Sequence, residues 1–134
     1  MNTLRRWGRT SMSSWRVPID PVHPYVTLDW DVRYDTRHST LKWRSMVAFL
    51  TGAGIHEVMT RHSAGGNTHV IIKWTYDLTF WERLVIRSIL QDDPYRISAD
   101  IRRYYRGLPV ERLFGIKATP GVLRKAGPWT RETF

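Results

Sequence analysis

A chain of 134 residues with 21 Lys and Arg, 12 Asp and Glu and no cysteine has the size of one domain, and the lack of cysteine excludes disulfides, thiolate zinc sites and thiol catalysis. No apolar run reaches the roughly 18–20 residues of a membrane helix, and the first residues lack the apolar core of a signal peptide, so we expect a cytoplasmic protein with no membrane partner. The net charge of +9, to which 17 arginines contribute, favours DNA or RNA as a partner, although a GC-rich genome or a hot habitat would also raise the arginine content.

Residues 1–24 are predicted to form a basic N-terminal arm. Arg5, Arg6 and Arg9 lie in a stretch of sixteen residues without an acid, and Trp7 lies between them. Arginine binds phosphate and an aromatic ring can stack on a base. We therefore expect this arm to contact nucleic acid.

Three strands and a helix are predicted next. Apolar and polar residues alternate over 25–32, which indicates a half-buried strand. Apolar residues at i, i+4 and i+7 predict a helix over 39–50. Two β-prone runs at 55–62 and 69–76 flank a Gly-rich segment, 63–67, which is typical of a hairpin loop.

A second helix is predicted to begin at Thr79, because Glu82 three residues later completes a capping box. Its expected apolar stripe consists of Trp81, Leu84, Val85 and Ile89. A third helix is predicted with Asp93 as N-cap and Pro94 in the first turn. Its expected inner face is Ile97, Ile101 and Tyr104 or Tyr105, and its Arg96, Asp100 and Arg103 are expected to pair on the surface.

The last predicted strand covers residues 110–117, and a tail follows at 118–134. The order of elements is then β-α-β-β-α(α)-β. This order predicts an α+β fold, a ferredoxin-like βαββαβ two-layer sandwich over residues 25–117. In that arrangement the antiparallel sheet has the strand order 4-1-3-2 and the helices lie on one face.

On that plan, the polar sides of two central strands meet on the open face of the sheet. Asp29, Asp31 and His69 would project together there, and Glu111 would join them from the neighbouring strand. Two carboxylates at i and i+2 can hold Mg²⁺ or Mn²⁺, which prefer oxygen ligands. The sequence therefore makes Asp29, Asp31 and Glu111 candidate metal ligands.

The motif Asp29-Trp30-Asp31, followed by Ser63 and by His69 six residues after it, resembles the palm of archaeo-eukaryotic primases. The resemblance implies that Asp29 and Asp31 bind metal and that Ser63 and His69 meet nucleotide phosphate. Asp29, Asp31 and His69 would then be catalytic residues of a metal-dependent nucleotidyltransferase. A palm that kept binding and lost catalysis fits the same residues.

A second resemblance is to rolling-circle replication initiators, which share this fold. Their metal-binding His-hydrophobic-His strand corresponds here to Asn67-Thr68-His69, and their nucleophilic tyrosine corresponds to Tyr104 or Tyr105. Such a tyrosine attacks phosphorus when a metal polarises the phosphate. The resemblance implies a nicking activity.

The segment 90–96, with Asp100 downstream, is similar to a pattern in small proteins from mobile elements of hyperthermophilic archaea, which implies a viral or plasmid origin and a hot habitat. We expect a role in the replication of such an element. Our leading hypothesis is a nucleic-acid-binding protein rather than an enzyme. We expect it to bind phosphates through Arg5, Arg6, Arg9, Arg102, Arg103 and Arg106, with Trp7 and Ser63 in contact with the strand. The remaining alternative is a structural homodimer that closes the open sheet face.

Overall fold

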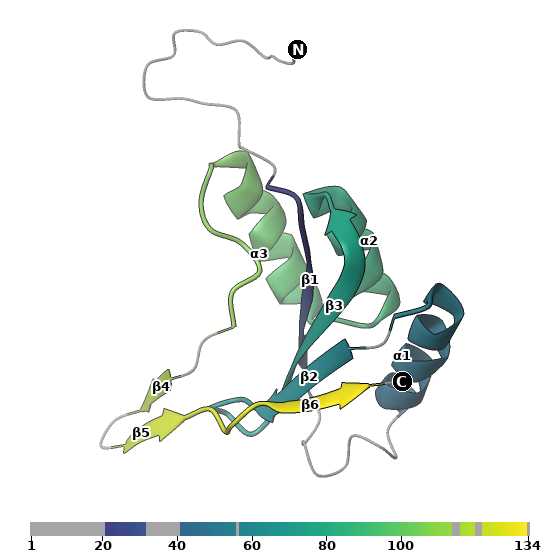
Figure 1. The fold of residues 1–134 in the computed structure, drawn as a ribbon. Coiled ribbons are helices and arrows are strands. Elements are labelled where there is room, and N and C mark those ends of the chain that lie inside the picture. Colours follow the sequence, from purple (N-terminus) through teal and green to yellow (C-terminus); the bar gives the residue numbers. More distant parts are fainter. Residues whose placement is uncertain (1–20, 32–40, 56, 114–115, 120–121, 134) are drawn as a thin grey trace, which may run out of the picture.

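In a computed structural model, the placement of residues 21–31, 41–55, 57–113, 116–119 and 122–133 is described, with the side chains of 116–119 and 122–124 left out. The elements follow in the order β1 (His23–Trp30), α1 (Leu41–Ala53), β2 (Glu57–His62), β3 (Thr68–Leu78), α2 (Phe80–Ile89), α3 (Pro94–Tyr105), β4 (Ile116–Thr119), β5 (Val122–Lys125) and β6 (Thr130–Thr133) (Figure 1). The fold is therefore α+β, as expected. No helix in the described part of the chain is long and apolar enough to span a membrane.

The main sheet is antiparallel with the order β1-β3-β2-β6, so the predicted order 4-1-3-2 is wrong. β1 pairs with β3, as predicted, but it lies at the edge of the sheet instead of at its centre. The fourth strand is β6, which comes from the C-terminal tail and pairs with β2. β4 pairs only with β5, in a separate two-stranded sheet.

The predicted strand over 110–117 is also wrong, because residues 110–113 form a loop and only 116–117 belong to β4. The loop passes Glu111 at a positive φ of 62°, a value that a strand does not adopt. The residues at the outer edge of β1 explain why no strand forms here. Side chains, rather than a strand, occupy the outer edge of β1.

Two side chains bond the outward-facing backbone groups of β1. The backbone N–H of Asp29 donates to Asp92 Oδ1 over 2.8 Å, and the carbonyl of Thr27 accepts from Arg96 Nη1 over 2.9 Å. A neighbouring strand would need the same backbone groups for its ladder. The edge is thus closed by Asp92 and Arg96, and no fourth strand can pair there.

The core lies between one face of the sheet and the helices α1 and α2. The buried residues alternate along the strands as predicted, with Val26, Leu28 and Trp30 on β1 opposite Val70 and Ile72 on β3. α1 adds Trp43, Met46 and Leu50, and the end of α2 adds Ile86 and Leu90. The Trp30 indole N–H donates to the Leu90 carbonyl over 2.9 Å, which satisfies its one polar group in the core.

The predicted starts of α2 and α3 are confirmed. Thr79 and Glu82 form the reciprocal bonds of a capping box, and the Asp93 side chain caps the first turn of α3 by accepting from the backbone N–H of Tyr95. The predicted inner face of α2 is wrong. Leu84 is buried, but the other three residues of the stripe, Trp81, Val85 and Ile89, are exposed.

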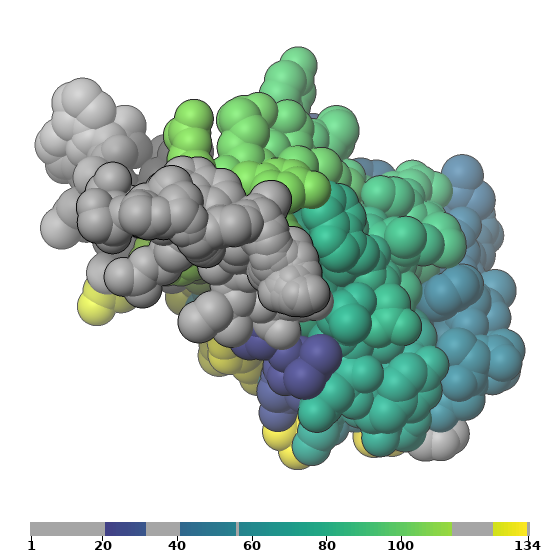
Figure 2. Space-filling view, turned by 90° about the horizontal axis from the view of Figure 1, so that it is seen from above, coloured from purple at the N-terminus to yellow at the C-terminus, as the bar shows by residue number. Residues whose placement is uncertain are grey.

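Figure 2 looks onto the end of the molecule where residues of α3 and α2 reach the surface. The two helices pack through aromatic rings, since Tyr104 stacks on Phe80 with ring centroids 4.2 Å apart. The only fully buried residue of α3 is Asp100, while Ile97 and Ile101 are half-buried and Tyr105 is exposed. Charged residues therefore take part in the buried faces of both helices, since Arg83 and Arg87 are buried on α2 and Asp100 on α3.

Of the expected pairs of α3, Arg103 with Asp100 is formed over 3.3 Å, but Asp100 is buried and belongs to a network of buried ion pairs. From α2, Arg87 Nε lies 2.7 Å from Asp92 Oδ2, and Arg87 Nη2 lies 3.0 Å from Asp100 Oδ2. Arg83 Nε lies 2.8 Å from Glu111 Oε2, and the Glu111 backbone N–H donates to Asp100 over 3.1 Å. Asp100 is thus a buried link between α2, α3 and the loop, and not a surface residue. We call Arg83, Arg87, Asp92, Asp100 and Glu111 the buried ion network.

Candidate functional site

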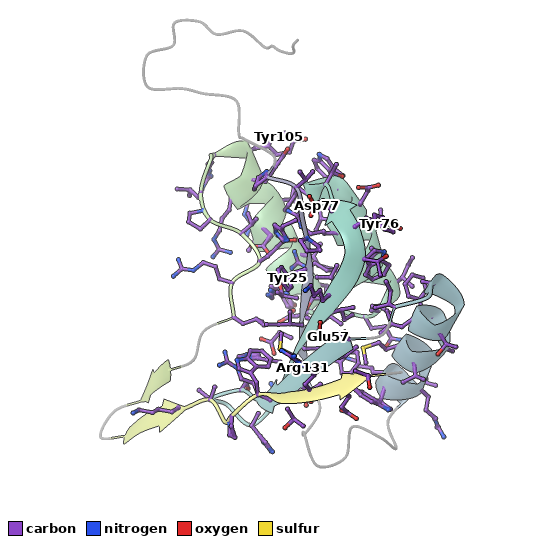
Figure 3. The ribbon with its side chains drawn as sticks, in the orientation of Figure 1. Tyr25, Glu57, Tyr76, Asp77, Tyr105 and Arg131 are labelled. Atoms are coloured by element: carbon purple, nitrogen blue, oxygen red, sulfur yellow. The ribbon has the colours of Figure 1, made fainter. Side chains whose placement is uncertain are left out.

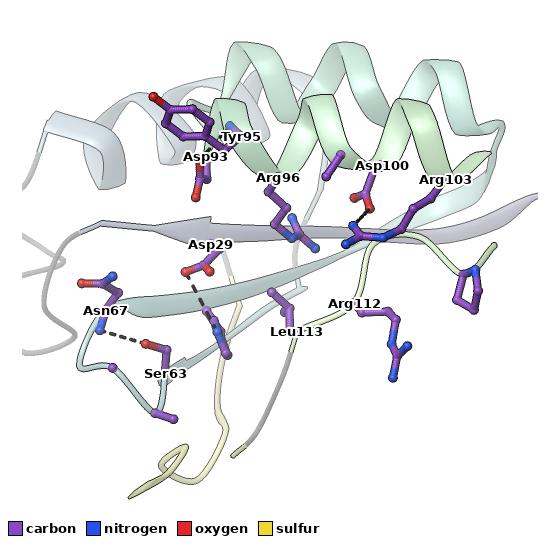
Figure 4. Close-up of a pocket in the computed structure, with 15 residues that line it drawn as sticks. Asp29, Ser63, Asn67, Asp93, Tyr95, Arg96, Asp100, Arg103, Arg112 and Leu113 are labelled. Atoms are coloured by element: carbon purple, nitrogen blue, oxygen red, sulfur yellow. Dashed lines mark hydrogen bonds and ion pairs between the residues drawn. The ribbon is translucent and has the colours of Figure 1, made fainter. Parts of the chain in front are cut away.

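A cleft of about 690 Å³ lies between the β2–β3 hairpin, α3 and the loop before β4 (Figure 4). Its walls bring together residues that are up to 84 positions apart in the sequence, from Asp29 to Leu113. The lining consists of Asp29, Ser63, Ala64, Gly65, Asn67, His69, Asp93, Tyr95, Arg96, Ala99, Asp100, Arg103, Pro109, Arg112 and Leu113. A cavity of this volume is in the range of small-molecule and cofactor sites.

The hairpin wall of the cleft is held by bonds within its own loop. The Ser63 N–H donates to the Asn67 carbonyl over 2.7 Å, and the Asn67 N–H donates to Ser63 Oγ over 2.9 Å. Gly66 has a φ of 91°, which only glycine adopts readily. The loop therefore holds Ser63 and Asn67 at the edge of the cleft, and the predicted hairpin is confirmed.

The floor of the cleft carries an ordered polar pair. Arg61 Nε donates to His69 Nδ1 over 3.1 Å, so in the neutral imidazole the proton is on Nε2. His69 Nε2 lies 4.0 Å from Asp29 Oδ1. That separation is too long for a direct hydrogen bond, so the two atoms present a donor and an acceptor side by side.

Burial and nearby charges shift the pKa values of both His69 and Asp29. Burial, together with the smaller effects of the nearby Arg61 and Arg96, lowers the pKa of His69 to about 4. Burial also raises the pKa of Asp29, against the effect of Arg96, and the neighbouring Asp92 adds to the rise. His69 is therefore an uncharged hydrogen-bond donor at neutral pH.

The low pKa of His69 predicts a loss of stability in mild acid. The unfolded histidine, with a pKa near its ordinary value of 6.5, takes up a proton before the folded one does. The free energy of unfolding should therefore fall between about pH 6.5 and pH 4, by up to about 3 kcal/mol, and the contribution should level off below that range. Urea unfolding across pH will show this loss in the wild type and a smaller one in His69→Gln. An NMR titration midpoint of His69 near 6.5 would contradict the prediction.

Exposed arginines gather beside the cleft. Arg102, Arg103 and Arg106 lie in the last turns of α3 and its cap, and Arg112 lies in the following loop. The two acids nearest in sequence, Asp100 and Glu111, are buried and paired with Arg87 and Arg83. Within residues 101–113, the charged side chains that remain exposed are therefore all arginines. We call the four exposed residues the arginine cluster.

The structure brings together some of the predicted site residues. Asp29, Ser63, His69 and Arg103 all line the cleft. Asp31 is exposed just after β1 and borders, with Asp29, a neighbouring cavity of about 500 Å³. Arg102 and Arg106 are exposed nearby, with Arg102 bonded to Ser98. Arg5, Arg6, Arg9 and Trp7 lie outside the described residues.

Glu111 is not placed with the other two predicted metal ligands. Both of its carboxylate oxygens accept from Arg83 Nε, and His23 Nε2 lies 3.3 Å from one of them. In the described ranges of the chain, no group of three His, Asp or Glu residues is arranged to hold a metal ion. Asp29 and Asp31, at the smaller cavity, are the two predicted ligands that share a cavity.

Sequence reasoning missed Arg61, Tyr95 and Arg112. Arg61 orients His69 and lies under the Trp129 ring, 4.3 Å from its centroid. Tyr95 lines the cleft from α3 and Arg112 lines it from the loop before β4, and the sequence did not predict that these two elements lie close together. The contact between Arg61 and His69 could have been predicted from the hairpin, because the two residues lie directly opposite each other in the pairing of β2 with β3.

Comparison with known proteins identifies no relative of this chain. No family model matches the sequence, and neither the curated proteins nor the solved structures yield a match.

Proposed function

We propose that this protein binds nucleic acid, with the phosphates of the strand held by the arginine cluster at the mouth of the cleft. The observation that carries the proposal is that the charged residues of 101–113 with exposed side chains are four arginines, whereas Glu111 in the same segment and the preceding Asp100 are buried. Arginine binds phosphate through a planar fork and is a common phosphate contact in nucleic-acid interfaces. The net charge of +9 favours the same partner.

Arg103 and Arg112 are the members of the cluster that line the cleft. The Arg103 side chain is 48% exposed and has one ion pair, with Asp100 at 3.3 Å. Asp100 keeps its pair with Arg87 when Arg103 is removed, so the buried carboxylate still has a cationic partner. These arginines can therefore be tested without removing a buried charge.

The double variant Arg103→Ala, Arg112→Ala should bind a labelled single-stranded oligonucleotide more weakly than the wild type. The slope of log affinity against log salt should shrink by about 0.7 for each arginine removed, because each phosphate contact releases counterions. Fluorescence polarisation over a salt series measures both quantities. The matched control is Arg44→Ala, which removes an exposed arginine from α1, away from the cleft. Equal losses in the variant and the control, or binding that does not depend on salt, would refute the proposal.

A second candidate is metal-dependent nucleotidyl transfer, favoured by the placement of Asp29, Ser63 and His69 in one cleft. Asp29 and Asp31 would hold the ion, which would stabilise charge on a transferring phosphate. Primer extension with Mn²⁺ and nucleotides tests this candidate. Synthesis that disappears in the Asp29→Ala, Asp31→Ala variant supports it, and its absence from the wild type counts against it.

A further inference from the structure

The size of the cleft limits what part of a nucleic acid can enter it. A volume of about 690 Å³ suits a group as large as a nucleotide, and the hairpin loop and α3 bound it on two sides. Arg103 and Arg112 line the same cavity as Asp29 and His69. A phosphate at the arginines therefore directs the attached nucleotide toward the polar pair.

The polar pair on the floor matches one edge of a nucleobase. His69 Nε2 can donate and Asp29 Oδ1 can accept, and at 4.0 Å the two atoms do not bond each other directly. Both residues line the cleft. The Watson–Crick edge of every base places an acceptor next to a donor, and proteins read this edge in bases that are unstacked. In a duplex the same edge is engaged with the opposite base. The floor thus favours a base that is unpaired.

The rim supplies an aromatic ring. Tyr95, in the first turn of α3, borders the cleft and is 85% exposed, so most of its ring is open to a ligand. Figure 4 shows its ring standing at the start of the helix, on the side of the cleft where Asp29 lies. Arg103 is eight residues further along α3, or about 12 Å, which places it within reach of neighbouring phosphates of the same strand.

From this arrangement we infer that the cleft takes one unpaired nucleobase of a single strand, which stacks on Tyr95 and bonds Asp29 and His69 through its Watson–Crick edge. This inference rests on the proposed function, because the arginine cluster holds the strand. It adds the ligand class, single-stranded nucleic acid, and the residues that distinguish it from a duplex.

The inference is tested with three labelled probes of equal length in EDTA: a single strand, the same strand with abasic sites, and its duplex. The wild type should bind the single strand more tightly than the other two probes, by about 5- to 150-fold, the range measured for stacking of one base on an aromatic side chain. Tyr95→Ala should lose a similar factor on the single strand and nothing on the abasic strand. Tyr95→Phe should bind like the wild type, because the ring is kept.

Tyr76→Ala is the matched control, since Tyr76 is also exposed but lies near the far end of β3 (Figure 3). It is seven residues from His69, a distance of about 23 Å along the strand. Asp29→Ala should weaken binding of the single strand and leave the abasic strand unaffected. These variants change exposed or half-exposed side chains, and circular dichroism checks that each remains folded.

Two failures can be told apart. If the three probes bind equally and binding still requires Arg103 and Arg112, the base-binding role is wrong and the proposed function stands. If no probe binds with a salt dependence, both are wrong. A Tyr95→Ala variant that binds the single strand as tightly as the wild type also overturns the inference.

Discussion

Asp92→Ala should lower the free energy of unfolding by about 3–5 kcal/mol, which is a large part of the 5–15 kcal/mol typical of a small domain. The Asp92 carboxylate has no exposed surface, and it accepts from Arg87, Arg96 and the Asp29 backbone N–H. Its removal leaves the Arg87 guanidinium buried with one remaining partner. It also opens the edge of β1. Urea unfolding at pH 7 measures the loss.

The neighbouring Asp93 provides the control for this prediction. Asp93 caps α3 from a more exposed position, where loss of an N-cap costs about 0.5–2 kcal/mol. Asp92→Asn, which keeps the shape and one acceptor oxygen, should be less harmful than Asp92→Ala. Similar losses in Asp92→Ala and Asp93→Ala would show that the buried network contributes little to stability.

Glu111→Ala should also be destabilising by about 3–5 kcal/mol, and equally so with Mn²⁺ or with EDTA. The reason is that the Arg83 side chain, which is fully buried, loses its carboxylate partner and keeps only carbonyl oxygens, those of Pro21 and Leu78. Calorimetric or urea unfolding in the two buffers separates this structural role from the metal-binding role that the sequence suggested. A loss that appears only in Mn²⁺ would restore the metal-binding role.

The backbone at Glu111 calls for a second variant. Glu111 has a φ of 62°, where glycine is less strained than alanine. Glu111→Gly should therefore recover about 1 kcal/mol relative to Glu111→Ala and remain well below the wild type. Full recovery in Glu111→Gly would mean that backbone strain, and not the Arg83 pair, determines the effect.

Most local features of the fold could be predicted from the sequence. The alternation of Val26, Leu28 and Trp30 identified the buried face of β1, and the hairpin loop at 63–67 was located because glycines separate two β-prone runs. The starts of α2 and α3 were predicted from Thr79 and Asp93, since an N-cap bonds residues only two or three positions away. Each of these signals depends on neighbours in the sequence.

The cleft was predicted in part. Alternation placed Asp29 and His69 on the same face of paired strands, and the structure places them 4.0 Å apart. Arg112 and Tyr95 could not be assigned to this cleft. Their positions depend on how the loop and α3 return to the sheet, and the sequence indicated a strand where the loop lies.

The sequence by itself determined the net charge of +9, the three helices with the N-caps of α2 and α3, and the buried faces of β1 and β3. Only the tertiary structure decided where that charge is exposed. Arg83 and Arg87 lie outside the apolar stripe that the sequence predicts for α2, yet both are buried. Their acidic partners, Glu111, Asp92 and Asp100, come from other segments of the chain. A buried charge needs a partner, and the partner can come from any part of the chain, so periodicity within one helix does not reveal it. Among residues 101–113, the charged side chains that stay exposed are therefore those of the arginine cluster.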